Sequence, residues 1–417
     1  MYRKSVLLNG IRVISESIPY VKSVTIGLWV GTGARSEQDY NHGISHFIEH
    51  LMFKGSHKRS AKCIAETVDA VGGQLNAFTA KEHTCYYMKV LDSKLELAVD
   101  VLSDMLLSSK FAKEDIERER QVVLEEFHMY EDTPDELVHD IHLSKIWSRH
   151  PLGRSILGST KSIGLFNEML VKEYYQQFYT PDNLVIAAAG NVDHDKLVQL
   201  SERFFASMTG TKKAIESAKP SFIPTQTVRT KDTEQVHLCL STQGVSQKSP
   251  DSYKLHALNN ILGGGISSRL FQAIREEKGL AYSIYSYQTN YSDVGLFTVY
   301  AGTRPANTVQ VIEIISETLQ SIRKEGITES ELLRAKEQLK GGLFLGLESS
   351  SSRMSRLGKM ETTLERYVTL EEVVEKIEKV TLKDVKLAAE QLFIPEGFGL
   401  TALGPINESD IPKISNI

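Results

Sequence analysis

Two histidines and a glutamate stand close together in the segment His46-Phe47-Ile48-Glu49-His50. Apolar spacing predicts a helix over residues 43–54, and at about 100° per residue His46, Glu49 and His50 occupy an arc of roughly 100° on one face. Two neutral imidazoles at positions i and i+4 can bind one Zn²⁺ ion, with the glutamate nearby as a base for water rather than as a ligand. The alternative is a surface histidine pair on an amphipathic helix.

A catalytic zinc ion needs a third protein ligand and an open fourth position. Residues 114–131 are predicted to form a carboxylate-rich helix, in which Glu119 and Glu126 are seven residues apart and share one face with a Val-Val pair. A carboxylate on an apolar face requires a partner, so one could bind the metal while the other orients a ligating imidazole through its second ring nitrogen. Spacing alone does not choose between Glu125 and Glu126.

The chain that carries these helices repeats itself. Residues 177–184 and 190–192 match residues 391–398 and 404–406 at a constant offset of 214, and residues near the start of each half match at an offset of 213. A few identities could arise by chance, but agreement at both ends with the same order of elements indicates two homologous domains in tandem. We expect domains over 1–208 and 227–417, joined by a polar, proline-bearing linker over 209–226.

Each half mixes strands with long helices. Hairpin-like neighbours among the strands predict an α+β fold, in which helices cover a largely antiparallel sheet. In the first half we expect strands over 13–15, 24–30, 74–79, 84–91 and 184–189 and helices over 43–54, 61–71, 93–108, 113–130 and 134–147; in the second half, strands over 236–241, 282–287, 295–301 and 398–403 and helices over 306–323 and 329–347.

Composition excludes several classes of protein. The 417 residues include 41% hydrophobic and 24% charged residues, which is ordinary for a globular protein. With 53 acidic against 48 basic residues, the net charge of −5 gives no global positive field for nucleic acid. The three cysteines are widely spaced, so no disulfide framework is expected. Without a signal-like segment or an apolar run near the ~18 residues that span a bilayer, we expect a cytoplasmic protein without a membrane partner.

The complete pattern, with Glu126 lying 76 residues beyond His50, resembles the pitrilysin family of zinc metallopeptidases, the inverzincins. Chain length and the two-domain organisation resemble the catalytic subunit of mitochondrial processing peptidase and its short bacterial relatives in that family. The resemblance implies that His46, His50 and Glu126 bind one Zn²⁺ per chain. It also implies that Glu49 is the general base and that Glu119 is a supporting acidic residue.

The segment 72–79 resembles the substrate-binding edge strand of this family. The resemblance implies that a peptide substrate binds in an extended conformation alongside Asn76, Ala77, Phe78 and Thr79. Main-chain hydrogen bonds at such an edge tolerate many sequences, so specificity would come from side-chain pockets and from the size and charge of the cavity.

The second half lacks the metal motif. At the offset of 213, Asn259, Leu262 and Gly263 occupy the positions of its three polar residues. Arg275 and Tyr282, taken alone, are a surface helix cation and the start of a strand. They resemble, however, an Arg/Tyr pair in the noncatalytic domain of the family that contacts substrate, and Tyr282 could donate a hydrogen bond to the developing oxyanion.

The resemblance therefore implies a zinc-dependent endopeptidase that hydrolyses unfolded or presequence-like peptides inside a chamber. Because such a chamber needs four domains and one chain supplies two, it also implies a homodimer. Two alternatives remain, a noncatalytic scaffold protein of the same fold and a metal-dependent hydrolase of another substrate. Scaffold relatives typically lose ligand positions, so the intact set of polar residues here favours an enzyme.

Overall fold

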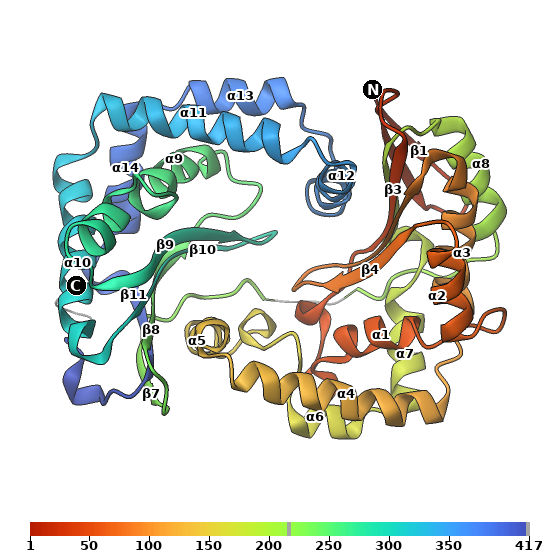
Figure 1. The fold of residues 1–417 in the computed structure, drawn as a ribbon, viewed down its shortest axis with the longest axis horizontal. Helices are drawn as coiled ribbons and strands as arrows, with labels where there is room; N and C mark the ends of the chain where they lie inside the picture. Colours follow the sequence, from red (N-terminus) through yellow and green to blue (C-terminus); the bar gives the residue numbers. More distant parts are fainter. Residues whose placement is uncertain (215–217, 414–417) are drawn as a thin grey trace. The chain divides into compact units, whose positions relative to one another are not determined.

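The computed structural model describes residues 1–214 and 218–413. Its helices and strands form two compact units (Figure 1). The first unit consists of Met1–His128, Arg154–Ser217 and Gly346–Tyr367, and the second of Met129–Gly153, Ala218–Leu345 and Val368–Ile417. The domains expected from the sequence, 1–208 and 227–417, are continuous segments, whereas each unit contains one helix from the other half of the chain.

A six-stranded sheet forms the centre of the first unit. Its order is β1-β2-β6-β3-β5-β4, and every neighbouring pair is antiparallel except the parallel pair β2 and β6. The strands are β1 (Tyr2–Val6), β2 (Arg12–Ser17), β3 (Ser23–Val30), β4 (Gln74–Thr79), β5 (Thr84–Leu91) and β6 (Leu184–Gly190).

Helices cover both faces of this sheet. Along β3, Val24, Ile26 and Leu28 enter the main core, to which α3 (Leu95–Ser108) and α8 (His194–Phe205) contribute, while the alternate residues face α12 (Ser350–Leu364) (Figure 1). On that second face the Trp29 indole N–H donates to Met354 Sδ at 3.2 Å. Covering both faces explains why β3 is apolar at nearly every position rather than alternating.

The remaining helices of the first unit contribute residues to the same main core. Two of them, α1 and α4, carry the polar residues of the predicted metal site. The last residues of α4 lie beyond His128, where the first segment of this unit ends. They are α1 (Ile44–Met52), α2 (Ala61–Asp69), α4 (Lys113–Glu131), α6 (Thr160–Leu165) and α7 (Glu168–Phe178).

The second unit contains a five-stranded sheet with the order β7-β11-β8-β10-β9, in which only β7 and β11 are parallel. This order and these directions repeat those of β2-β6-β3-β5-β4. The strands are β7 (Gln226–Thr230), β8 (Val236–Gly244), β9 (Ala281–Asn290), β10 (Gly295–Thr303) and β11 (Phe398–Gly404).

Helices also pack on both faces of the second sheet. On one face lies α5 (Pro134–Ile146), a helix from the first half of the sequence that contacts β8 and β11 (Figure 1). On the other face are helices that include α9, α10 and α14. The second unit's remaining helices are α9 (Ser252–Gly263), α10 (Thr308–Glu325), α11 (Glu329–Gly346), α13 (Leu370–Glu378) and α14 (Leu382–Leu392).

Element boundaries agree with the sequence repeat. Adding 214 to the bounds of α7 and β6 gives the bounds of α14 and β11. The fold is therefore the expected α+β architecture of two homologous halves, each with a largely antiparallel sheet covered by helices. Within the described residues, no helix combines the length and the apolar character needed to cross a bilayer.

Candidate metal centre

The helix α1 presents the motif on one face and buries the other. Phe47, Ile48 and Leu51 pack into the core of the first unit. Before the first turn, the buried carboxylate of Glu37 accepts hydrogen bonds from the backbone N–H groups of Gly43, at 2.7 Å, and Ser45, at 2.9 Å. These bonds satisfy donors that a helix start leaves open and fix where α1 begins.

Burial raises the pKa of Glu37 to about 7, against the effect of these two backbone hydrogen bonds. Gly43 adopts φ 90°, and a Cβ at this position would lie 2.6 Å from Gly158 Cα. Only glycine fits here without displacing backbone. The entry of α1 is therefore tightly defined by Glu37 and Gly43 together.

The helix α4 supplies the carboxylates. Ile116, Glu119 and Val123 are its buried residues, and Glu126 continues the same stripe one turn later. Of the Val-Val pair expected on this face, Val123 is buried, but Val122 is 47% exposed, so that expectation was wrong for Val122. A step of one residue rotates the side chain by about 100°, which is enough to carry it out of the contact.

Two imidazoles and one carboxylate converge between α1 and α4. His46 Nε2 lies 3.7 Å from Glu126 Oε1, and His50 Nε2 lies 3.4 Å from Glu126 Oε2. One ligand atom from each of the three residues lies within 4.8 Å of the others. In the described residues this is the only cluster of at least three His, Cys, Asp or Glu groups with such geometry. Glu125, the alternative that spacing left open, is exposed and outside the cluster.

The donor set fits a zinc ion. A tetrahedral zinc ion with bonds of about 2.0–2.1 Å separates its ligand atoms by roughly 3.4 Å, similar to the two imidazole–carboxylate distances above. His46 Nδ1 is buried and makes no hydrogen bond within the described residues, so the ring is held by packing and by its contacts at Nε2. His46 Nε2 faces Glu126, so this nitrogen is the one available to a metal ion.

Charges in the cluster favour the same conclusion. Burial lowers the pKa of His46 to about 4, reinforced by His50 and opposed by Glu126, so His46 is neutral at neutral pH as a metal ligand must be. For His50, burial also lowers the pKa, but the acidic groups Glu126, Glu119 and Glu49 together outweigh burial and raise it. The hydrogen bond from His50 is the main reason that the pKa of Glu126 is lowered.

Glu49 lies beside this cluster and is connected to the edge strand β4. The Thr79 hydroxyl donates to Glu49 Oε2 at 2.5 Å. Burial raises the pKa of Glu49, and the bond from Thr79 partly opposes this. Sequence reasoning assigned Thr79 to the strand alone and missed this contact, because nothing in local spacing relates residue 79 to residue 49.

The strand β4 is the last strand of its sheet and pairs only with β5 among the described strands. Asn76 is exposed, and Ala77 packs against the core on the opposite face. The Phe78 ring makes an edge contact with Trp29, at 5.6 Å between ring centres. All four residues expected for substrate binding, Asn76 to Thr79, therefore lie on a sheet edge that extends toward Glu49.

Arg275 and Tyr282 contact each other in the second unit. Arg275 Nη1 donates to the backbone oxygen of Tyr282 at 2.9 Å, and its guanidinium lies 4.6 Å from the Tyr282 ring centre and 4.8 Å from that of Phe271. Tyr282 is 73% exposed. Arg275 belongs to a π-helical turn, Phe271–Glu276, rather than to a regular surface helix.

The helix α9 occupies in the second half the place that α1 has in the first. It carries Asn259, Leu262 and Gly263 and no imidazole or carboxylate at these positions. The Asn259 backbone oxygen accepts a hydrogen bond from the Ser286 hydroxyl, and Gly263 allows Ser286 to approach closely. These three residues pack the helix onto the sheet and provide no metal ligand.

Comparisons with known proteins find matches over most of the chain. Residues 12–160 match the family model described as "Insulinase (Peptidase family M16)", and residues 167–339 match that described as "Peptidase M16 inactive domain". The chain is 45% identical over 405 residues to the "Uncharacterized zinc protease YmxG" of Bacillus subtilis, covering 97% of this chain and 98% of the relative. It is 42% identical over 408 residues to the "Uncharacterized zinc protease Rv2782c" of Mycobacterium tuberculosis, covering 97% and 93%.

Solved structures show the same fold at lower sequence identity. A protease from Helicobacter pylori superimposes with a TM-score of 0.90 at 23% identity, covering 97% of this chain and 99% of that one. A protein from Pseudomonas fluorescens described as a peptidase M16 inactive domain superimposes with a TM-score of 0.91 at 20% identity, covering 98% of both chains.

Proposed function

We propose that this chain, which belongs to peptidase family M16, is a zinc-dependent endopeptidase. The observation that carries the proposal is the convergence of His46, His50 and Glu126, with Glu49 on the same helix face as both imidazoles. Relatives named zinc proteases, similar over nearly the whole chain, support the coarser assignment to zinc proteases. One zinc ion per chain is proposed, because α9 offers no second set of ligands.

His46 Nε2, His50 Nε2 and a Glu126 oxygen would hold the ion. Zinc bound there supplies Lewis acidity, which polarises the scissile carbonyl and lowers the pKa of water. Glu119 accepts from His50 Nδ1 at 3.3 Å, which orients that ring. Glu49 would take the proton of the attacking water and return it to the leaving amine. Because Thr79 donates to Glu49 Oε2, the proton acceptor would be Oε1.

Substrate would bind as an extended strand against the free edge of β4. Hydrogen bonds to the backbone from Asn76 to Thr79 would place the scissile bond near Glu49, since Thr79 contacts that residue. Arg275 and Tyr282 would contact substrate from the second unit, with the exposed Tyr282 hydroxyl as a donor to the oxyanion. We further propose that unfolded or presequence-like peptides are the substrates and that a homodimer encloses the chamber.

The scaffold alternative predicts no hydrolysis by any form of the protein. The test is cleavage of a quenched peptide library by wild type, with and without chelator, followed by added Zn²⁺. We expect cleavage that the chelator abolishes and Zn²⁺ restores. Absence of cleavage by the zinc-loaded protein would favour the scaffold, and zinc-dependent hydrolysis of a non-peptide ester alone would favour another substrate class.

Variants assign the roles. Glu49→Gln should retain zinc in metal analysis and lose hydrolysis by at least the ~10²–10⁴-fold typical of a general base, whereas His50→Ala should lose both. The control is Glu66→Gln, the same change at a carboxylate on α2 that is 67% exposed. Peptidase activity retained in Glu49→Gln would remove Glu49 as the base.

A further inference from the structure

A lysine that no catalytic pattern includes contacts the acidic residue behind the metal cluster. Lys54 lies two residues beyond the end of α1 at Met52, and so directly after the helix that carries the imidazoles. Lys54 Nζ lies 2.7 Å from Glu119 Oε1. The other oxygen of the same carboxylate, Oε2, lies 3.3 Å from His50 Nδ1. One carboxylate thus bridges Lys54 and His50.

The environment of Glu119 makes this second partner important. Its side chain is only 5% exposed, so an unpaired charge here would be costly. A histidine that binds a metal through Nε2 carries its proton on Nδ1, and that N–H usually donates to an outer-shell acceptor. A carboxylate held at only one oxygen can rotate, so that either oxygen accepts the bond from His50. The orientation of the His50 ring would then change with that of the carboxylate. Lys54 occupies Oε1 and leaves Oε2 for the ring.

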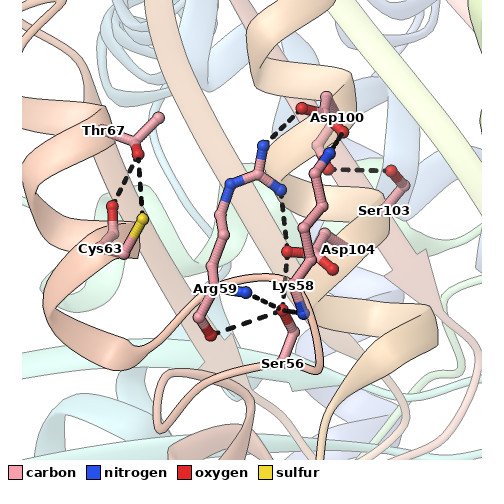
Figure 2. Close-up of polar contacts among 8 residues, drawn as sticks. All are labelled: Ser56, Lys58, Arg59, Cys63, Thr67, Asp100, Ser103 and Asp104. Carbon is pink, nitrogen blue, oxygen red and sulfur yellow. Dashed lines mark hydrogen bonds and ion pairs between the residues drawn. The ribbon is translucent and has the colours of Figure 1, made fainter.

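The backbone that carries Lys54 is also held in place. In the loop that follows, Arg59 donates to Asp104 at 2.8 Å and to Asp100 at 2.5 Å, both on α3, and Ser56 donates to Asp104 at 2.7 Å (Figure 2). A lysine ion pair on the surface usually contributes little because both side chains are mobile. Here the partner is buried and the loop is anchored, so the geometry can be maintained.

We propose that Lys54 is a positioning residue for the metal site. By holding Oε1 of Glu119, it keeps Oε2 on His50 Nδ1 and so maintains the ring orientation and tautomer in which Nε2 faces Glu126. Among the contacts of the described residues, Lys54 pairs with Glu119 and with none of His46, His50, Glu126 and Glu49. The inference rests on the proposed function only in taking zinc as the ion.

The first test measures zinc dissociation constants of the full chain by competition with a chelating dye. Lys54→Met should weaken zinc binding by about 10–100-fold, as loss of an outer-shell partner does, while Lys54→Arg should remain within about threefold of wild type because it keeps the charge and a donor. The control is Lys62→Met, the same change at a lysine on α2 that is 84% exposed.

Two further readouts separate positioning from general stability. In the Glu119→Gln background, Lys54→Met should have no additional effect on the dissociation constant, because the bridge is already broken. In zinc-loaded protein, the His50 Nδ1–H NMR signal should be protected from solvent exchange in wild type and Lys54→Arg, and exchange-broadened in Lys54→Met. Additive effects of the two substitutions, or wild-type affinity in Lys54→Met, would overturn the inference.

If Lys54→Met does not fold, the zinc dissociation constant of Lys54→Gln and the His50 Nδ1–H NMR signal of Lys54→Arg provide the test instead. Failure of the proposed function is distinguishable, since wild type itself would then bind no zinc or cleave no peptide. Unchanged binding confined to the Lys54 variants would reject the positioning role alone.

Discussion

Protonation of His142 in the second unit should make its stability strongly dependent on pH. His142 lies on α5 and is 2% exposed. Its Nδ1 lies 2.9 Å from Thr401 Oγ1 on β11, and its Nε2 lies 2.7 Å from Ser241 Oγ on β8. Because the ring bridges two strands with both nitrogens, it fastens α5 to the sheet as a neutral imidazole.

The size of the effect follows from the pKa. Burial, reinforced by the charge of His139, lowers the pKa of His142 from 6.5 to about 3. At pH 5 the unfolded state therefore binds a proton that the native state does not. The stabilising contribution is fully present above pH 6.5 and is lost as the pH falls toward 3. At pH 5, 1.5 units below 6.5, the loss is about 2 kcal/mol at about 1.36 kcal/mol per unit.

Comparison with His142→Gln isolates this group, because other histidines titrate equally in both proteins. The chain has two tryptophans, and Trp147, directly after α5, is the one in the second unit. Urea unfolding of wild type and variant, both in a Trp29→Phe background with chelator present, is followed by Trp147 fluorescence at pH 8 and pH 5. The advantage of wild type should shrink by about 2 kcal/mol at pH 5.

Parallel stabilities of the two proteins between pH 8 and pH 5 would refute this reasoning. Should the variant fail to fold, the NMR titration of the His142 ring in wild type gives the same information. A ring that titrates near pH 6.5 in the folded protein would contradict the neutral, buried bridge.

Two further changes test the metal site and the sheet packing. Glu126→Gln should weaken zinc binding at least about 100-fold, beyond most outer-shell effects, whereas the exposed neighbour Glu125→Gln should leave zinc content unchanged; equal losses in metal analysis would reject the ligand assignment. Gly358→Ala should destabilise the first unit by about 1–3 kcal/mol in urea unfolding, because a Cβ there would lie 2.1 Å from Trp29 Cε2; a neutral substitution would show that α12 does not pack on this ring.

Features that depend on neighbours along the chain could be predicted from the sequence. The helix expected over residues 43–54 is α1, Ile44–Met52, and the predicted face of His46, Glu49 and His50 is directed at α4. Helical periodicity relates residues three or four apart, so one segment contains all the information needed. The tandem repeat was likewise readable, because equivalent strands and helices recur at a constant spacing.

Contacts between segments that are distant in the chain could not be predicted from the sequence in this way. His142 on α5 is buried against the sheet, where its ring contacts β8 and β11. Hydrophobic periodicity treats histidine as a polar residue and so places it on an exposed face. His142 can nevertheless be buried, because the hydroxyls of Ser241 and Thr401 form hydrogen bonds with its ring. Those partners are about 100 and 260 residues away, so no local pattern indicates them.

The sequence by itself determined which residue types could bind a metal, the helix face that displays them and the doubling of the α+β unit. Only the tertiary structure decided that Glu126 rather than Glu125 meets both imidazoles. It also decided that Thr79 contacts Glu49 and that Lys54 contacts Glu119. Finally, it decided that α5 and α12 each pack on the sheet formed by the other half of the chain. The physical reason is that a helix specifies directions from its own axis, whereas the partner found in each direction depends on how separate apolar surfaces bury one another.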